Sequence, residues 1–466
     1  MRLIDVTYRL LAIFANVMLA ACGGVQVKQN TELDAVLQTG NYSQAALMAE
    51  ERIGIDAPSV TEERSPVEYN PKHVLSHLEA AEAWRMHGDR ERSLEHYDAA
   101  EMALGDVESS VGRRAAGKVG AALVNETLAA YVPSPAEAVM INYYKALTFW
   151  SEGQPDLARV ELNRADDRTR RAVERYAKEI SEAQAEAARK KSNQTYDNPE
   201  VAGQINSQFP EMEQWQPYAE FVVPPATYLQ ALFLGMSDVP SDMEKSRELY
   251  ERLGGIVGTH PALDADLADV AEGGLCPSND CIWILVERGL GPELQERRFS
   301  YPVYTGQSVV SVQMALPALA SRFDPMLASC AIHHGTESTD CVPIATMDRV
   351  VQTEFTKRFP GIVTRSVVSA VVKGVAQDQA GRQGGMMGML IATAITAGIT
   401  TADVRMWRSL PGDFTMARLK RNGDPNVSVQ IAGQVIDIPL SATGSNLIHV
   451  KLPIAYGKAS ITTIAL

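Results

Sequence analysis

Four cysteines and two histidines in the second half of the chain are the residues whose types and spacing could carry chemistry. They are Cys276, Cys281, Cys330, His333, His334 and Cys341. The last four could ligate zinc, but their spacing matches none of the usual zinc frames. The alternative is two local disulfides, Cys276 with Cys281 and Cys330 with Cys341, since each pair would close a short loop rich in turn residues. We favour the disulfides and expect no metal, with free thiols as a third possibility.

A fifth cysteine, Cys22, lies at the end of an apolar stretch near the start of the chain. Residues 10–21 are apolar apart from one asparagine, which is the length of a signal-peptide core and too short for a membrane span. Residues 19–22, Leu-Ala-Ala-Cys, look like a bacterial lipobox. The resemblance implies cleavage between Ala21 and Cys22, loss of a signal peptide over residues 1–21, and lipid on Cys22. Two or more acyl chains would then hold the protein stably at a bilayer.

The residue after Cys22 indicates where in the cell the protein is located, and the net charge indicates which partners it can bind. Gly23, not aspartate, follows Cys22, which resembles the default outer-membrane signal of Gram-negative lipoproteins. We therefore expect an outer-membrane protein that is lipid-anchored through Cys22 and faces the periplasm, an oxidising compartment that suits disulfides. The alternative is a plain secretory signal. A formal charge of −14 argues against a nucleic-acid partner, which would need a basic surface.

The first half of the chain contains a repeated pattern of small and large apolar residues on either side of a glycine turn. The matching positions are Ala81, Trp84, Gly88, Tyr97 and Ala100 in one copy, and Ala146, Phe149, Gly153, Ala158, Leu162 and Ala165 in the next. Small residues let two helices approach, and large ones fill the space between them. The pattern resembles the tetratricopeptide repeat (TPR), although the turns of the two copies are 65 residues apart and the array is therefore interrupted.

The remaining segments of this half fit a helical domain over residues 22–270. Looser helical pairs are expected at 30–55 and 226–253. Residues 156–191 predict a long charged helix, and residues 192–217, rich in asparagine, glutamine and proline, predict a loop. The fold class expected for this part is an α-solenoid of TPR-like repeats.

The periodicity changes at about residue 276, and residues 276–466 predict a mixed domain. Strands are expected at 281–287, 299–304, 309–315, 327–332, 414–419, 427–431, 435–438, 447–452 and 461–466, and helices at 347–359 and 363–379. We expect an α+β domain in which helices cover one face of a mostly antiparallel sheet. The whole chain is then α+β and multidomain.

Residues 383–402 are uncharged and rich in glycine, alanine and threonine. Their length would permit a membrane span, but only one apolar stripe of isoleucines runs along them. Three interpretations stay open: a helix packed within the domain, a self-association face built on small residues, or insertion into a membrane.

Three further motifs contain residues of types that could carry chemistry. Asp403 and Arg405 would lie on one side of a strand with Trp407 beside them, either as a structural ion pair with an aromatic plug or as a contact for a partner or glycan. His73 and His77 share a helix face but lack the glutamate of a metalloprotease motif. Residues 112–119 nearly spell a phosphate-binding loop, yet valine stands where that loop needs Ser or Thr.

Several segments together resemble a family: uncharacterised TPR-containing outer-membrane lipoproteins of Gram-negative bacteria. They are residues 142–147, 158–168, 228–232, 287–290 and 402–411, which span most of the mature chain. The resemblance implies the two-part architecture. It carries over no catalytic residue and no cofactor.

The expected function follows from this architecture. Stacked repeats form extended surfaces that hold peptides or helices, so we expect a non-enzymatic scaffold or assembly factor that binds an unidentified envelope protein. The alternative is a cell-wall ligand-binding protein or an envelope enzyme with its site in the C-terminal domain. A cleft lined by His333, Asp403 and Arg405 would favour that alternative.

Overall fold

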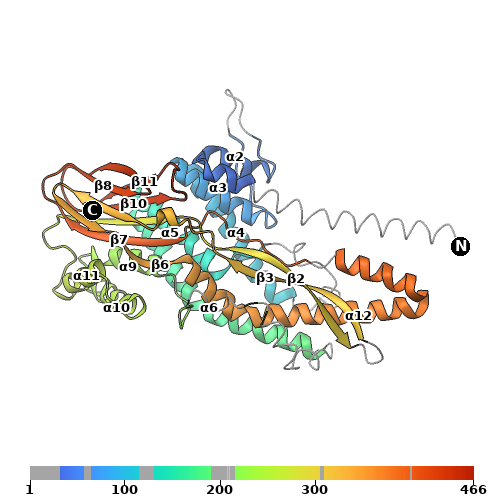
Figure 1. Ribbon diagram of the computed structural model, residues 1–466. Coiled ribbons are helices and arrows are strands. Elements are labelled where there is room, and N and C mark those ends of the chain that lie inside the picture. The colour runs from blue at the N-terminus through green and yellow to red at the C-terminus, as the bar shows by residue number, and fades with distance from the viewer. Residues whose placement is uncertain are drawn as a thin grey trace.

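The computed structural model describes most of the chain and shows a mixed α+β protein (Figure 1). The described residues are 32–56, 64–114, 131–189, 207, 209, 216–304, 309–398 and 401–466. The expected signal peptide, Ala21 and Cys22, and nearly all of the expected loop at 192–217 lie outside them.

The helical half is built from antiparallel pairs of helices. They are α3 (Val74–His87) with α4 (Arg90–Arg114), α5 (Pro135–Ser151) with α6 (Pro155–Arg189), and α9 (Pro224–Gly235) with α10 (Pro240–Val257), preceded by α2 (Tyr42–Glu51) and followed by α11 (Pro261–Ala271). The first two pairs turn at Gly88 and Gly153, whose φ angles of 101° and 71° are left-handed and therefore favour glycine. The long charged helix expected at 156–191 is α6.

The small residues of the repeated pattern lie between these helices. Ala81, Ala100, Ala146 and Ala158 are fully buried, and the other apolar positions of the pattern are buried too, except for Phe149, which is partly buried. The small residues that we identified in the sequence therefore allow α3 to pack closely against α4, and α5 against α6.

A five-stranded sheet forms the centre of the C-terminal half. Its order is β11 (Ser460–Ala465), β10 (Asn446–Leu452), β1 (Cys281–Arg288), β7 (Asp413–Lys420) and β6 (Val342–Thr346). Only the β1–β10 pairing is parallel among these described strands, so the sheet is mostly antiparallel, as predicted. Strand β1 is buried along its whole length, because both faces of the sheet are covered.

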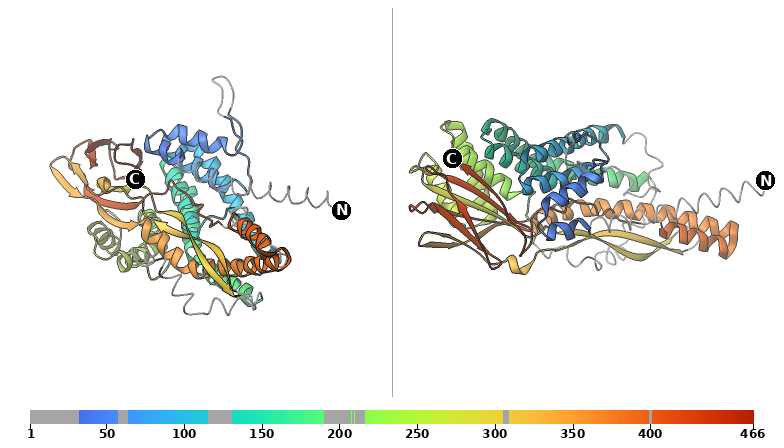
Figure 2. Two further views of the ribbon diagram at one scale, coloured as in Figure 1. Left: turned by 45° about the vertical axis from the view of Figure 1, so that its right-hand side comes forward. Right: turned by 90° about the horizontal axis from the view of Figure 1, so that it is seen from above.

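Each face of this sheet has its own cover. Trp283 and Leu285 of β1 pack against the helical half, whereas Ile282, Ile284 and Val286 face a second sheet. That sheet has the order β5 (Glu337–Asp340), β4 (Cys330–His334), β8 (Asn426–Ile431) and β9 (Gln434–Pro439). The prediction of helices on one face therefore holds, and the other face is covered by strands (Figure 2).

An arm projects from this body (Figures 1 and 2). It consists of the hairpin β2 (Glu293–Tyr304) and β3 (Val309–Ala320), packed along α12 (Met347–Gly398), and α6 runs beside it. The arm has a core of its own, which includes Val312, Leu316, Phe355, Phe359 and Val367.

The structure corrects one prediction on the arm and describes the first residues of the uncharged segment. We expected two helices, at 347–359 and 363–379, but α12 continues through Pro360 because its buried face keeps packing against β3 on both sides of that exposed proline. The uncharged segment begins where α12 breaks at Gly385, whose φ is 61°. Met386 and Met387 beyond it are 81% and 66% exposed, so this start of the segment is not packed within the domain.

Residues Met347–Met387 of α12 are long and apolar enough to cross a membrane by length and composition alone. Half of the most apolar stretch within these residues is buried inside the protein. The side chains of 388–400 lie outside the described part of the chain.

Candidate functional site

The segment 401–411, which links α12 to β7, runs between the helical half and the sheet in an irregular conformation. Acidic side chains accept hydrogen bonds from its backbone. Trp407 N donates to Glu137 Oε1 of α5 at 2.6 Å, and Arg408 N donates to Glu79 Oε1 of α3 at 2.6 Å. Backbone N–H groups in a buried segment need such partners when no strand pairs with them. This segment therefore joins the two halves of the protein.

Trp407 is a buried aromatic side chain, as the structural interpretation of this motif expected. Its side chain is 1% exposed, and its ring lies 6.0 Å from that of Tyr97 and 5.9 Å from that of Tyr144. The indole Nε1 donates to Ser409 Oγ at 2.7 Å. A residue so enclosed cannot contact a partner.

Asp403 and Arg405 form the expected ion pair, but not on a strand. Arg405 Nη2 lies 2.6 Å from Asp403 Oδ2, and Arg405 Nε donates to Asp403 Oδ1 at 2.8 Å. The expectation of a strand here was wrong. The carboxylate also accepts from Arg405 N, so a local turn brings the two side chains together instead of strand alternation.

Both residues line a pocket of about 320 Å³ where α5, the base of the arm and segment 401–411 meet. The apolar lining consists of Tyr131, Val132, Ala136, Leu294, Pro317, Val351, Phe355, Ile362, Met406 and Leu410, and the polar lining of Ser134, Glu137, Glu354, Arg358, Arg365, Asp403 and Arg405. The pocket thus has as many carboxyl groups as guanidinium groups, three of each, around a mainly apolar surface.

The two buried carboxyl groups of the pocket, Glu137 of α5 and Glu354 of α12, meet at the first turn of α5. Glu137 Oε2 accepts from Ser134 N at 2.7 Å and from the Tyr131 hydroxyl at 2.5 Å, and Ser134 Oγ caps the helix. Glu354 accepts from Ala136 N at 3.3 Å and is paired with Arg358 at 3.2 Å. Burial raises the pKa of Glu354, and it raises that of Glu137 to about 7, although three hydrogen bonds oppose the shift.

The shift at Glu137 predicts a pH dependence of stability. Because its folded pKa is raised above its ordinary value of 4.5, this group stabilises the fold below pH 4.5, and the contribution is lost as the pH rises through about 7. Between pH 5 and pH 8, the unfolding free energy of Glu137→Gln should therefore gain about 2 kcal/mol relative to wild type. Urea denaturation at both pH values measures this, with the exposed Glu248→Gln as control. A constant difference between the two proteins would contradict it.

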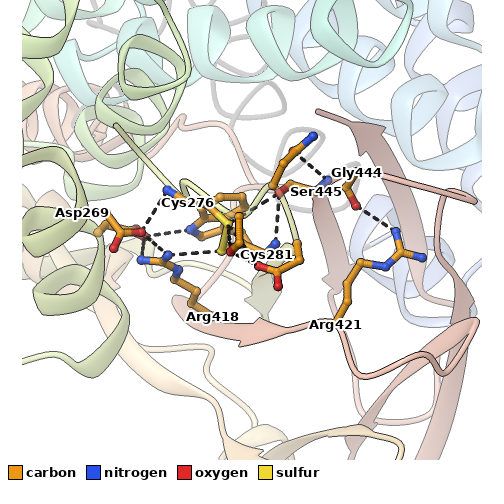
Figure 3. Close-up of a disulfide and its surroundings, with 12 residues drawn as sticks. Asp269, Cys276, Cys281, Arg418, Arg421, Gly444 and Ser445 are labelled. Carbon is orange, nitrogen blue, oxygen red and sulfur yellow. Dashed lines mark hydrogen bonds and ion pairs between the residues drawn. A yellow bond between two sulfur atoms is a disulfide. The ribbon is translucent and has the colours of Figure 1, made fainter. Parts of the chain in front are cut away.

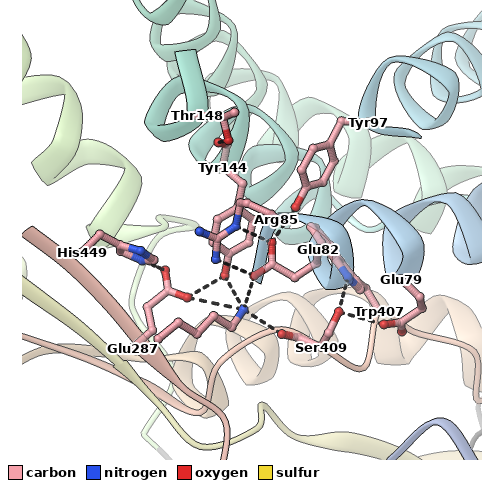
Figure 4. Close-up of polar contacts among 11 residues, drawn as sticks. Glu79, Glu82, Arg85, Tyr97, Tyr144, Thr148, Glu287, Trp407, Ser409 and His449 are labelled. Atoms are coloured by element: carbon pink, nitrogen blue, oxygen red, sulfur yellow. Dashed lines mark hydrogen bonds and ion pairs between the residues drawn. The ribbon is translucent and has the colours of Figure 1, made fainter. Parts of the chain in front are cut away.

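Behind the pocket, a buried network of charges joins the two halves (Figure 4). Lys451 of β10 is 0% exposed, and its Nζ donates to Glu82 Oε1 at 2.6 Å, to the Tyr144 hydroxyl at 3.0 Å and to Ser409 O at 2.8 Å. Glu287 of β1 accepts from the Tyr144 hydroxyl at 2.8 Å and lies 3.4 Å from Lys451 Nζ. Contacts from α3, α5, strand β1 and segment 401–411 thus converge on the ammonium group of one residue of β10.

This network keeps its carboxylates ionised. Burial opposes ionisation of Glu287, but His449 and Lys451 outweigh it and lower its pKa to about 2. Burial likewise opposes ionisation of Glu82, but Arg85 and Lys451 hold its pKa below the usual range. Arg85 reaches Glu82 with two hydrogen bonds of 2.7 Å. The arrangement stabilises the junction between the two halves.

The two predicted disulfides are confirmed. Cys276 is bonded to Cys281, and Cys330 to Cys341, with Cα–Cα distances of 6.2 Å and 5.3 Å. Around the first, Cys281 N donates to Ser445 Oγ at 3.0 Å, and Arg418 Nη2 lies 3.2 Å from Cys281 Sγ (Figure 3).

The histidines do not form the metal sites that were considered. With Cys330 and Cys341 bonded to each other, His333 faces Gln430 at 3.1 Å and His334 faces Asn426 O at 2.9 Å. His73 precedes α3 as its N-cap, whereas His77 is buried, with its Nδ1 3.0 Å from Nδ1 of His96. Burial lowers the pKa of His77 to about 3. Among the described residues, the side chains of Cys276, Asp280 and Cys281 cluster as metal ligands would, but both sulfurs are in the disulfide.

Sequence reasoning found two residues of the pocket and missed its other charged members. It named Asp403 and Arg405, but not Glu137, Glu354, Arg358 or Arg365. The spacing of Ser134 and Glu137 is a helix-capping signature and could have drawn attention to Glu137. No signal in the sequence predicts that α12 lies beside Glu137. His333 does not line the pocket.

No family model, curated protein or solved structure matches this chain.

Proposed function

We propose that this chain is an outer-membrane lipoprotein that faces the periplasm and acts there as a non-enzymatic scaffold. Lipid on Cys22 would hold it at the membrane, and a segment of another envelope protein would bind in the pocket beside α5. The two disulfides support an oxidising compartment. Residues 402–411, which carry part of the resemblance to TPR-containing lipoproteins, form the segment that joins the two halves.

Packing of paired helices in the helical half supports the scaffold role. The pairs α3–α4 and α5–α6 turn at left-handed glycines and bury their small residues between them. Side chains of α3 and α5, among them Glu82 and Tyr144, contact Lys451 and Glu287 of the sheet. Because the C-terminal half covers this side of the repeats, we place partner binding at the pocket and not along an open groove.

The observation that carries the proposal is the composition of the pocket. An apolar side chain of a partner would fit against Phe355, Ile362 and Leu294. The charged groups of both signs around them match the donors and acceptors of a polypeptide backbone better than they match a ligand with one net charge. Pockets that take a few anchoring side chains are typical of protein interfaces.

Site-specific photocrosslinking in cells tests this role. A photoreactive amino acid at Ile362, which is half-buried in the pocket, should yield one discrete adduct with an envelope protein. The same amino acid at Val435, which is exposed on β9, should not. The adduct at Ile362 should also disappear when Leu294→Trp fills the pocket. An adduct that survives this change, or that forms equally at Val435, would argue against binding at the pocket.

One observation favours the second candidate, a cell-wall ligand-binding protein or envelope enzyme with its site in the C-terminal domain. Asp403 and Arg405 of that domain line the pocket, where they could contact the hydroxyl and carboxyl groups of a glycan or short peptide. Under this candidate, purified cell-wall fragments should bind the protein and prevent the crosslink at Ile362. Under the scaffold proposal they should leave it unchanged.

A further inference from the structure

A second pocket, separate from the candidate site, opens where the helical half meets the edge of the sheet. It has a volume of about 240 Å³ and lies between the α3–α4 turn, the end of α5 and the first residues of β11. Its lining consists of Arg85, Met86, His87, Gly88, Arg90, Leu147, Thr148, Ser151, Lys458, Ala459, Ser460, Ile461 and Thr462.

The lining of this pocket is basic although the chain is acidic. It contains two arginines, a lysine and a histidine, together with four hydroxyl groups, and no carboxylate is among these lining residues. The chain as a whole has a formal charge of −14. Arg85 and Arg90 share their charge with Glu82 and Glu152 outside the lining, so Lys458 supplies the unpaired positive charge, and a concave surface lined by cations attracts anions.

Arg85 brings a fixed cation to the wall of the pocket. Its side chain is 3% exposed, and its Nε and Nη2 are both held by Glu82. The guanidinium also lies 4.5 Å from the centre of the Tyr144 ring. No described residue accepts a hydrogen bond from Nη1, so one amino group of a rigid guanidinium is left to donate to a ligand.

Lys458 comes from the opposite wall, on the loop before β11. Its backbone is held by the turn before α2, because Tyr42 donates its hydroxyl proton to Lys458 O and a Cβ at Gly40 would lie 2.8 Å from Lys458 N. The side chain is exposed and forms no ion pair with any residue in the described part of the chain. The protein therefore fixes the position of this lysine without pairing its charge.

Favourable interactions of basic side chains with helix ends explain only some of the basic residues around this pocket. Basic side chains in the last turn of a helix stabilise its partial negative charge, which is a structural reason for Arg85 and His87 at the end of α3. Lys458 belongs to no helix, and Arg90 lies at the start of α4, where a cation is unfavourable. Arg90 is paired with Glu152 at 2.9 Å, outside the lining of the pocket.

We propose that this pocket binds a phosphate group. Several oxygens on a tetrahedral anion can accept from Arg85 Nη1, Lys458 Nζ and Arg90 at once, and such charge-assisted hydrogen bonds are the strong ones. The phosphate belongs either to a lipid headgroup or to a free phosphate compound, since both present the same oxygens.

Calorimetric titration of the full-length protein in detergent, at constant ionic strength, tests the site with inorganic phosphate as probe. Binding should be saturable. Lys458→Gln should weaken it about tenfold, because one charge-assisted contact is lost. Glu152→Gln should tighten it, because Arg90 would no longer be shared with a carboxylate. The exposed Lys245→Gln should have no effect, and unchanged melting temperatures would show that the variants are folded.

Two outcomes would overturn the proposal: phosphate binding that never saturates, or Lys458→Gln binding as tightly as wild type. A second titration with glycerophosphoglycerol, the soluble headgroup of phosphatidylglycerol, distinguishes the sources. Tighter binding of this diester than of inorganic phosphate would support a lipid headgroup, and the reverse order would support a free phosphate compound.

Discussion

Lys451→Ala is expected to lower the free energy of unfolding by about 3–5 kcal/mol, the usual cost of removing one partner from a buried ion pair. Lys451 is fully buried, and its Nζ contacts Glu82 at 2.6 Å and Glu287 at 3.4 Å. Without it, two ionised carboxylates stay in the core with less positive charge around them. The Tyr144 hydroxyl and Ser409 O also lose a donor.

Urea denaturation of the purified protein measures this loss, and Lys245→Ala is the matched control. Lys245 is exposed and its distance to Glu248 is 3.8 Å, so its removal should change the unfolding free energy by less than about 0.5 kcal/mol. Adding Glu287→Gln to Lys451→Ala should recover part of the stability, because this removes a buried carboxylate that has lost its ammonium partner, whereas Glu82 keeps its two hydrogen bonds from Arg85. A loss below 1 kcal/mol for Lys451→Ala would show that this network does not hold the two halves together.

Removal of the disulfides is the second change with a large expected effect. Each double Cys→Ala variant, one per bond, should lose about 2–3 kcal/mol, since each bond restricts the unfolded chain. The bonds join residues 5 and 11 positions apart, so the longer loop at Cys330–Cys341 should give the larger loss. Alanine fits both sites because all four sulfurs are buried.

The same loss should follow chemical reduction of the wild-type protein. Urea midpoints with and without a thiol reductant measure it, and the variant that lacks all four residues is the control, since the reductant should leave it unchanged. A wild-type midpoint that the reductant does not move would contradict a stabilising role for these bonds.

Local patterns were sufficient to predict the helical pairs and most strands. The spacing of Ala81, Gly88 and Ala100 depends on residues that meet within one pair of helices, so the sequence displays it directly. The disulfides were predictable for the same reason, because each joins neighbours along the chain. The strands β8 and β9 were also predictable, because apolar and polar residues alternate along them.

Features that depend on distant contacts were not predictable. Pro360 is a helix breaker by its type, and only the packing of α12 on β3 explains why the helix continues through it. Strand β1 pairs in parallel with β10, more than 150 residues away. The pocket likewise combines α5, α12, the base of β2 and segment 401–411, so no single window of sequence contains its charges.

Intact-mass spectrometry of the protein isolated from cell envelopes tests the central claim most directly. We expect a chain that begins at Cys22 and carries lipid, and whose mass rises by four hydrogens on reduction because it has two disulfides. Cys22→Ala should give no lipidated form. A native chain that begins at Met1, carries no lipid and does not change on reduction would contradict the account.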